Sequence, residues 1–324
     1  MKSNKSLQRE TWIDVSKTIL IYFMILGHCG LPQYNIWFYS FHMPAFFIIS
    51  GYLYKPHSPL KTMKNLFIPV IIFSIINLLF QIFLSIISGN WGILDSYKNC
   101  WLSYFMKGDY KSLFPGVWFI MVLFWGRCLM GDLKIIPQFK NKDLYLFIIS
   151  IVITIILPNI YTNYREMQDL HIIKTITCLP FLIIGKYFRC HNIFFNQKQF
   201  WIPSILFIVC IILTIYNGNI DIYSSTYGKN TLIMYINAIL ASLVLFNMCK
   251  HIHFCRFYFE LCSKGTLLIM GMHLIILCIL KYIIHKIGIE YTFICGITLS
   301  FITLIICIPL IWISLKKLPW IIGK

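Results

Sequence analysis

Charged residues, and acidic ones above all, are scarce in this chain. Of its 324 residues only 12% are charged, with 28 Lys and Arg against 11 Asp and Glu, whereas 59% are hydrophobic. Because a soluble domain carries about 25% charged residues, this composition excludes an ordinary soluble protein. In a soluble protein the formal charge of +17 would suggest a nucleic-acid partner, but in an apolar chain it fits basic loops that face anionic lipid. We therefore expect a lipid bilayer as partner and no nucleic acid.

The patterns that mark most soluble catalytic sites are missing too. The chain has no GxGxxG, Walker loop, GxSxG elbow or HExxH. Its twelve cysteines include no CxxC pair and no Cys/His cluster at zinc spacing, so we expect neither a disulfide framework nor a metal site. It also lacks a soluble domain, a repeat of fixed period and a low-complexity linker. We therefore expect one membrane domain over residues 1–324.

What the chain has in abundance is apolar runs near the ~20-residue length that crosses a bilayer. They predict an all-α, polytopic membrane protein with about ten transmembrane helices. No small-residue cleavage site follows the first run, so we expect it to be retained as the first span. The expected spans are 12–29, 36–54, 66–88, 116–133, 144–161, 174–188, 201–216, 230–248, 266–285 and 291–314.

Lys and Arg are unevenly distributed between the two sides that these spans define. An even number of spans puts both termini on the same side. With the N-terminus inside, the inner segments hold 18 Lys and Arg and the outer segments hold 8. Since basic residues collect on the cytoplasmic side, the count predicts that both termini are cytoplasmic.

Polar residues in the first two spans are the first candidates for a functional site. Lys17 and His28 are eleven residues apart, which puts them on one helix face, about 16 Å apart along the axis. His42 enters the second span from the same side as His28, so the two imidazoles can meet near the outer ends of adjacent helices. Beside a water-accessible cavity such a pair can act as general base and orienting partner. The alternative for His28 is a satisfied histidine at the membrane interface.

Three stretches in the N-terminal third carry polar residues at distinctive spacing. The first is Lys17 followed, after ten intervening residues, by His28. The second is the segment SFHMPAFFIISGY at Ser40–Tyr52, and the third is a basic stretch from Lys61 that leads into a span beginning at Pro69. Together they resemble the acyltransferase family 3 proteins, and among these the fucose 4-O-acetylase-like and polysaccharide O-acetyltransferase branch.

The resemblance is weaker elsewhere in the chain. Trp118 and Phe119 resemble the Trp-Phe that opens the corresponding helix in the family. The segment that ends at His273 resembles one that usually reads Tyr-Leu-x-His, although the tyrosine is absent here. In the basic stretch many relatives have arginines where this chain has Lys61 and Lys64.

The resemblance implies a ten-helix enzyme of the bacterial cytoplasmic membrane. Such an enzyme takes an acyl group, usually acetyl from cytoplasmic acetyl-CoA, and delivers it to a hydroxyl of a glycan of the capsule, exopolysaccharide or O-antigen type. It implies that His28 is the general base or a transient acetyl carrier, with His42 beside it. Lys17, Lys61 and Lys64, at the cytoplasmic end, are expected to bind the phosphates of coenzyme A. The alternative for Lys61 and Lys64 is positive-inside anchoring.

Two functions from other classes compete with the membrane O-acyltransferase. A transporter or flippase for a glycan or small solute would also place polar residues and prolines in its spans. It would be expected to carry an internal repeat, and no second copy of the FHMPAFF segment occurs, which favours the enzyme. A membrane-embedded assembly or sensor protein is the third possibility, and it predicts no dependence on acetyl-CoA.

Overall fold

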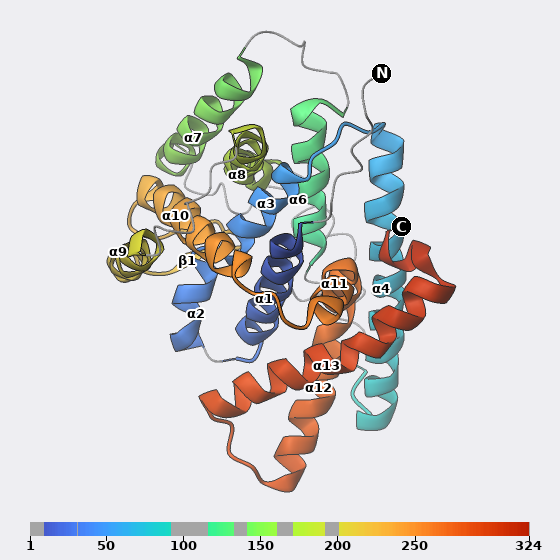
Figure 1. Cartoon of the computed structure of the whole chain (residues 1–324). Helices are drawn as coiled ribbons and strands as arrows, with labels where there is room; N and C mark the ends of the chain where they lie inside the picture. Colours follow the sequence, from blue (N-terminus) through green and yellow to red (C-terminus); the bar gives the residue numbers. More distant parts are fainter. Residues whose placement is uncertain are drawn as a thin grey trace.

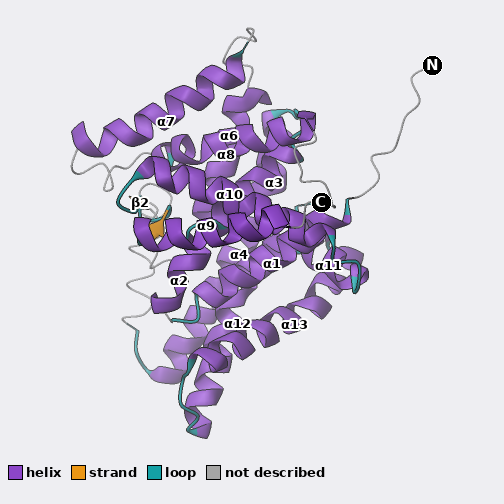
Figure 2. Cartoon of the chain, turned by 60° about the vertical axis from the view of Figure 1, so that its left-hand side comes forward, coloured by secondary structure: helices purple, strands orange, loops and turns teal. Residues whose placement is uncertain are grey.

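The protein is described by a computed structural model that covers residues 10–30, 32–91, 116–132, 141–160, 171–191 and 201–323. These residues are almost entirely helical (Figures 1 and 2). The helices are α1 (Thr11–Gly27), α2 (Pro32–Tyr39), α3 (His42–Tyr52), α4 (Pro59–Ser88), α6 (Val117–Arg127) with the π-helical turn η1 (Cys128–Asp132), α7 (Lys142–Ile160), α8 (Ile172–His191), α9 (Trp201–Asn217), α10 (Thr231–Lys250), α11 (Arg256–Lys264), α12 (Thr266–Ile287), α13 (Phe293–Lys317) and the 3-10 turn η3 (Pro319–Ile322).

Every range expected to span the membrane overlaps helix, which confirms the all-α class. Within the described residues, α4, α10, α12 and α13 are long and apolar enough to cross a bilayer. Two shorter apolar helical stretches, Trp118–Gly131 and Ile202–Asn217, accompany them. Length and composition thus fit a multi-pass membrane protein, and the count of ten spans stays a prediction.

The second expected span, 36–54, is not one helix but two, α2 and α3. In the turn between them, side chains form hydrogen bonds with carbonyl oxygens of α2. Ser40 Oγ donates to Trp37 O at 2.7 Å, and His42 Nδ1 lies 2.8 Å from Phe38 O. Pro44 in the first turn of α3 has no N–H with which to extend the hydrogen bonds of α2. The break therefore follows from local chemistry, and it places His42 at the start of a new helix.

α1 lies at the centre of the bundle, in contact with α3 and α10 and with α11, α12 and α13 (Figure 1). Twelve of its residues are buried, among them the polar Asp14, Ser16 and Thr18. Thr18 Oγ1 donates to its own helix, at Asp14 O (2.9 Å), and to Phe259 O of α11 (3.3 Å). The buried hydroxyl is thus satisfied by backbone, as an apolar interior requires.

α3 and α8 approach more closely than ordinary helices. A Cβ atom added to Gly51 of α3 would lie 1.9 Å from Leu182 O of α8, and one added to Gly185 of α8 would lie 1.9 Å from Ile48 O of α3. Small residues permit such contact between the backbones of membrane helices. Gly51 of the SFHMPAFFIISGY segment is therefore explained by packing, whereas Ser50 Oγ donates to Phe46 O within α3 at 2.8 Å.

A two-stranded antiparallel hairpin connects α9 to α10, with β1 (Ile220–Asp221) paired to β2 (Thr226–Tyr227) (Figure 2). It is tied to the helices on both sides. The Tyr227 hydroxyl lies 3.0 Å from Thr177 Oγ1 of α8, and Asn217 Nδ2 at the end of α9 donates to Tyr227 O at 3.2 Å. These bonds fix the hairpin against the bundle.

Candidate active site

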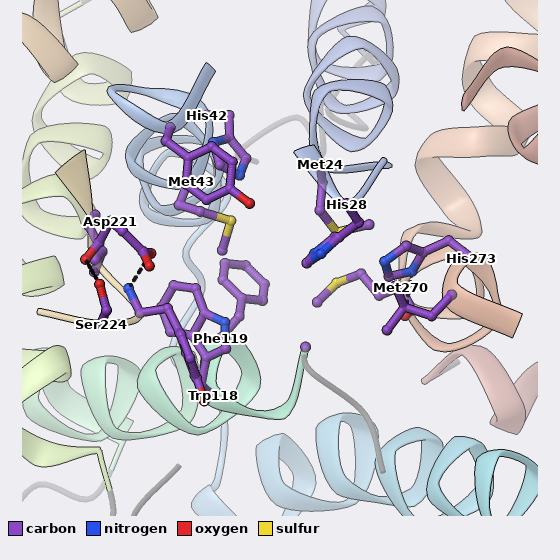
Figure 3. Close-up of a pocket in the computed structure, with 15 residues that line it drawn as sticks. Met24, His28, His42, Met43, Trp118, Phe119, Asp221, Ser224, Met270 and His273 are labelled. Atoms are coloured by element: carbon purple, nitrogen blue, oxygen red, sulfur yellow. Dashed lines mark hydrogen bonds between the residues drawn. The ribbon is translucent and has the colours of Figure 1, made fainter. Parts of the chain in front are cut away.

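A cavity of about 690 Å³ lies between α1, α2, α3, α6, α12 and the β1–β2 hairpin (Figure 3). Its wall combines methionine and aromatic side chains with a few polar groups. The polar side chains that the site uses are His28, Tyr39, His42, Asp221, Ser224 and His273. Three histidines, one just after the end of α1, one at the start of α3 and one in α12, thus meet in one cavity.

His28 immediately follows the last residue of α1, and its half-buried ring faces the cavity. Its backbone oxygen accepts a hydrogen bond from Lys281 Nζ at 3.2 Å. Its ring nitrogens have no hydrogen-bond partner among the described residues. The preceding Gly27 leaves room for Tyr39, whose ring would lie 2.8 Å from an added Cβ. The His28 imidazole is therefore available to a bound substrate.

His273 of α12 is the ring neighbour of His28, with the two ring centroids 5.2 Å apart (Figure 3). Its Nδ1 lies 3.0 Å from Ile269 O and 2.8 Å from Met270 O, so this nitrogen carries the proton and donates. Its buried Nε2 has no hydrogen-bond partner in the part of the chain that the structure describes. The neutral ring thus presents a free lone pair on Nε2, on the side of the cavity that it shares with His28.

His42 stands on another side of the cavity, at the first position of α3 (Figure 3). The contact between its Nδ1 and Phe38 O leaves Nε2 as the acceptor nitrogen. Its ring packs edge-to-face with Tyr39, at 5.2 Å between centroids. The two histidines singled out from the sequence, His28 and His42, therefore line the same cavity, but the ring that contacts His28 is His273.

The three lysines singled out from the sequence are not among the residues that line the cavity. Lys17 is half-buried on α1, eleven residues before His28. Lys61 and Lys64 are exposed in the first two turns of α4. The structure therefore does not gather the lysines and the histidines into one site.

At the far end of α3 from His42 the structure assembles a charged cluster that sequence reasoning missed. Arg189 Nη1 lies 3.3 Å from Tyr52 O and 3.5 Å from Tyr54 O, and the Arg127 guanidinium lies 5.2 Å from the centre of the Tyr54 ring. The Tyr52 hydroxyl donates to the Glu10 carboxylate at 3.0 Å. These contacts bind the C-terminal end of α3 to α6, α8 and the start of α1.

His273 and Asp221 line the cavity, although neither was assigned a role from the sequence. His273 carried a signal, because its segment resembles the family's Tyr-Leu-x-His. Asp221 carried none, since it is an isolated acid in a connection between apolar helices. Within the part of the chain that the structure describes, no group of three or more His, Cys, Asp or Glu side chains is arranged to hold a metal ion.

The bundle and its cavity are those of a multi-pass membrane protein with titratable groups enclosed among helices. A family model described as an acyltransferase domain, that of acyltransferase family 3, matches residues 10–313. The match extends over nearly the whole chain, so the chain belongs to this family and is a membrane acyltransferase. No curated protein and no solved structure matches it significantly.

Proposed function

We propose that the chain is an O-acetyltransferase of the polysaccharide branch of this family. It moves an acetyl group from cytoplasmic acetyl-CoA to a hydroxyl of a glycan that is exported or displayed on the cell surface. The proposal rests on one observation: in this acyltransferase a single cavity is lined by His28, His42 and His273. A sugar hydroxyl is a poor nucleophile at neutral pH and needs a base within hydrogen-bond reach.

His28 is the general base in this proposal. Its ring faces the cavity without a hydrogen-bond partner in the described residues. It takes the proton of the acceptor hydroxyl while that oxygen attacks the thioester carbonyl. The new C–O bond forms, the C–S bond breaks, and the proton passes from the imidazolium to the departing sulfur. The products are the acetylated glycan and free coenzyme A.

His273 and His42 are positioning residues for this step. His273 Nε2 is an acceptor beside the His28 ring, and a small rotation of either ring would let it accept a hydrogen bond from one His28 nitrogen. The other His28 nitrogen would then hold the lone pair that accepts the proton, by the logic of a base oriented by a third group. His42 presents Nε2 from another wall, where it can bind the acceptor or the thioester.

The donor is proposed to arrive from the cytoplasmic side of the bacterial inner membrane, where both termini lie. Lys61 and Lys64 are exposed at the start of α4, so they are open to an anion in water. Lys17 lies between that side and His28 on α1. Lysine ammonium groups bind phosphates as point charges, and the long pantetheine arm of coenzyme A can carry the acetyl group from there toward the cavity.

The test is acetyl transfer by the purified protein in nanodiscs. Labelled acetyl-CoA is mixed with surface polysaccharide of the host cell from which alkali has removed the ester groups, and the label in the polysaccharide is counted. We expect His28→Ala to lower the rate by on the order of 10²–10⁴-fold, the usual loss for a general base. The control is His285→Ala, an exposed histidine on α12, which should keep wild-type activity. A wild-type protein that transfers no label contradicts the proposal, and an active His28→Ala removes His28 from it.

A further inference from the structure

We propose that the β1–β2 hairpin builds a subsite for a neutral polyol within the cavity. Asp221 binds hydroxyl groups of the acceptor sugar there, and Tyr223 with Trp118 covers the sugar's apolar face. All three residues line the cavity, and Figure 3 labels Asp221 and Trp118. The inference rests on the proposed function, because it assigns the acceptor half of the same cavity.

Asp221 is the one carboxylate among the described residues that line the cavity. Its Oδ1 accepts the backbone N–H of Tyr223 at 3.0 Å, and no partner within the described residues is found for Oδ2. An ionised carboxylate is acceptor-only, and its hydrogen bonds are about twice as strong as neutral ones. Asp221 therefore offers its remaining acceptor capacity to a ligand that brings O–H donors.

The charge of the cavity selects among such ligands. No Lys or Arg belongs to the described lining, and Lys174, with Nζ 5.9 Å from the centre of the Tyr223 ring, is not part of it. An acidic sugar or a phosphate would therefore meet a carboxylate inside the cavity itself. A neutral sugar brings hydroxyl donors and no charge. The subsite is therefore suited to a neutral residue of the glycan and unsuited to the phosphates of coenzyme A.

Aromatic rings stand next to this carboxylate. The Trp118 and Tyr223 rings are 5.9 Å apart between centroids, with an angle of 55° between their planes. A pyranose has C–H groups on its face and hydroxyls at its edge, and the negative face of an aromatic ring attracts polarised C–H groups. A sugar that rests on these rings presents its edge hydroxyls to Asp221.

The hairpin is held rigidly enough to act as a recognition element. Asn217 Oδ1 accepts the N–H of Asn230 at 2.7 Å, while its Nδ2 donates to Tyr227 O. Gly228, with φ of +74°, lies so close that an added Cβ would be 2.5 Å from Asn217. A preorganised site loses less entropy when it binds, so Asp221 is placed before the sugar arrives.

The residue proposed to recognise the acceptor and the residues proposed for the reaction lie in different parts of the cavity. Asp221 lies on one side of the cavity, and His28 with His273 lies on the other (Figure 3). A sugar held at the hairpin by some of its hydroxyls can therefore present a different hydroxyl to His28. Asp221 is a specificity residue in this arrangement, and it takes no proton in the reaction.

The experiment measures acceptor and donor kinetics separately on Asp221→Asn in nanodiscs. The acceptor probe is oligosaccharide from the ester-free surface polysaccharide, and the donor is labelled acetyl-CoA. Asn keeps an oxygen that can accept the Tyr223 N–H, so the turn is retained. Loss of the charged acceptor should lower kcat/KM for the acceptor by on the order of 10- to 100-fold, with the KM for acetyl-CoA unchanged. The control is Glu290→Gln, an exposed acid between α12 and α13, which should match wild type.

A second variant, Tyr223→Leu, removes the aromatic face and keeps the carboxylate. It should raise the acceptor KM several-fold at unchanged donor KM, and it keeps the proposal testable if the Asp221 variant does not fold. Wild-type transfer with unchanged acceptor kinetics in folded Asp221→Asn and Tyr223→Leu overturns the hairpin subsite and leaves the proposed function standing. A wild-type protein without transfer overturns both.

Discussion

Replacing Gly51 by Ala should separate α3 from α8 and disturb the cavity from a distance. The added Cβ would lie 1.9 Å from Leu182 O, 2.7 Å from Leu182 C and 2.9 Å from Leu182 Cα. Ordinary contact begins at 3.4 Å, so the two backbones have to move apart by about 1.5 Å. Since these neighbours are backbone atoms within a helix, no side-chain rotation can relieve the overlap.

The cost of this substitution belongs at the upper end of the range for overpacking, about 3 kcal/mol. The unfolding entropy is about 2.1 cal/mol/K per residue, so each kcal/mol lowers Tm by about 1.5 °C in a chain of 324 residues, and we expect a loss of roughly 4–5 °C. Activity should fall as well, because α3 begins at His42 and carries that ring into the cavity.

The assay is the apparent Tm of purified protein in detergent, together with acetyl transfer in nanodiscs. Gly126→Ala is the matched control, since its Cβ would meet the same residue of α8 at 2.4 Å, but at the side-chain atom Leu182 Cδ1. That methyl group can turn aside, so the control should lose far less stability. If Gly51→Ala and Gly126→Ala have equal Tm values, close to wild type, the backbone contact between α3 and α8 does not hold this part of the bundle.

Three further predictions concern the site and the topology. His42→Ala should lower acetyl transfer less than loss of His28 does, because it removes a positioning group, and a larger loss in a folded variant would make His42 the base. Single Ala variants of Lys17, Lys61 and Lys64 should raise the KM for acetyl-CoA, and that KM should rise with ionic strength because salt screens exposed charges. Unchanged donor KM in all three would place the donor phosphates elsewhere. Reporters fused after Gly89 and at the C-terminus should lie on opposite sides of the membrane, whereas the same side for both would refute the predicted topology.

The composition and the apolar runs determined the all-α membrane class of this protein, and each predicted span overlaps helix, whereas α11 lies outside every predicted span. Helix formation in an apolar chain is local, because each backbone group must find its partner within the segment. The spacing of Lys17 and His28 along one helix could be derived from the sequence for the same reason. The resemblance to the family of the segments that carry His28 and His42 was also visible in the sequence. The break between α2 and α3 was missed because Trp37 to Phe47 is apolar enough for one span, although Pro44 within it is a local signal for the start of a new helix.

Tertiary structure alone decided which groups share the cavity. His273 contacts His28 although 245 positions of sequence separate them. The position of α12 depends partly on Gly271, which packs against the Phe73 ring of α4 so closely that an added Cβ would lie 2.2 Å from it. Asp221 reaches the same cavity through a hairpin anchored on α8 and α9. In a membrane the lipid-facing and protein-facing sides of a helix are both apolar, so close packing decides which faces meet. Hydrophobic pattern therefore could not reveal the third histidine or the carboxylate.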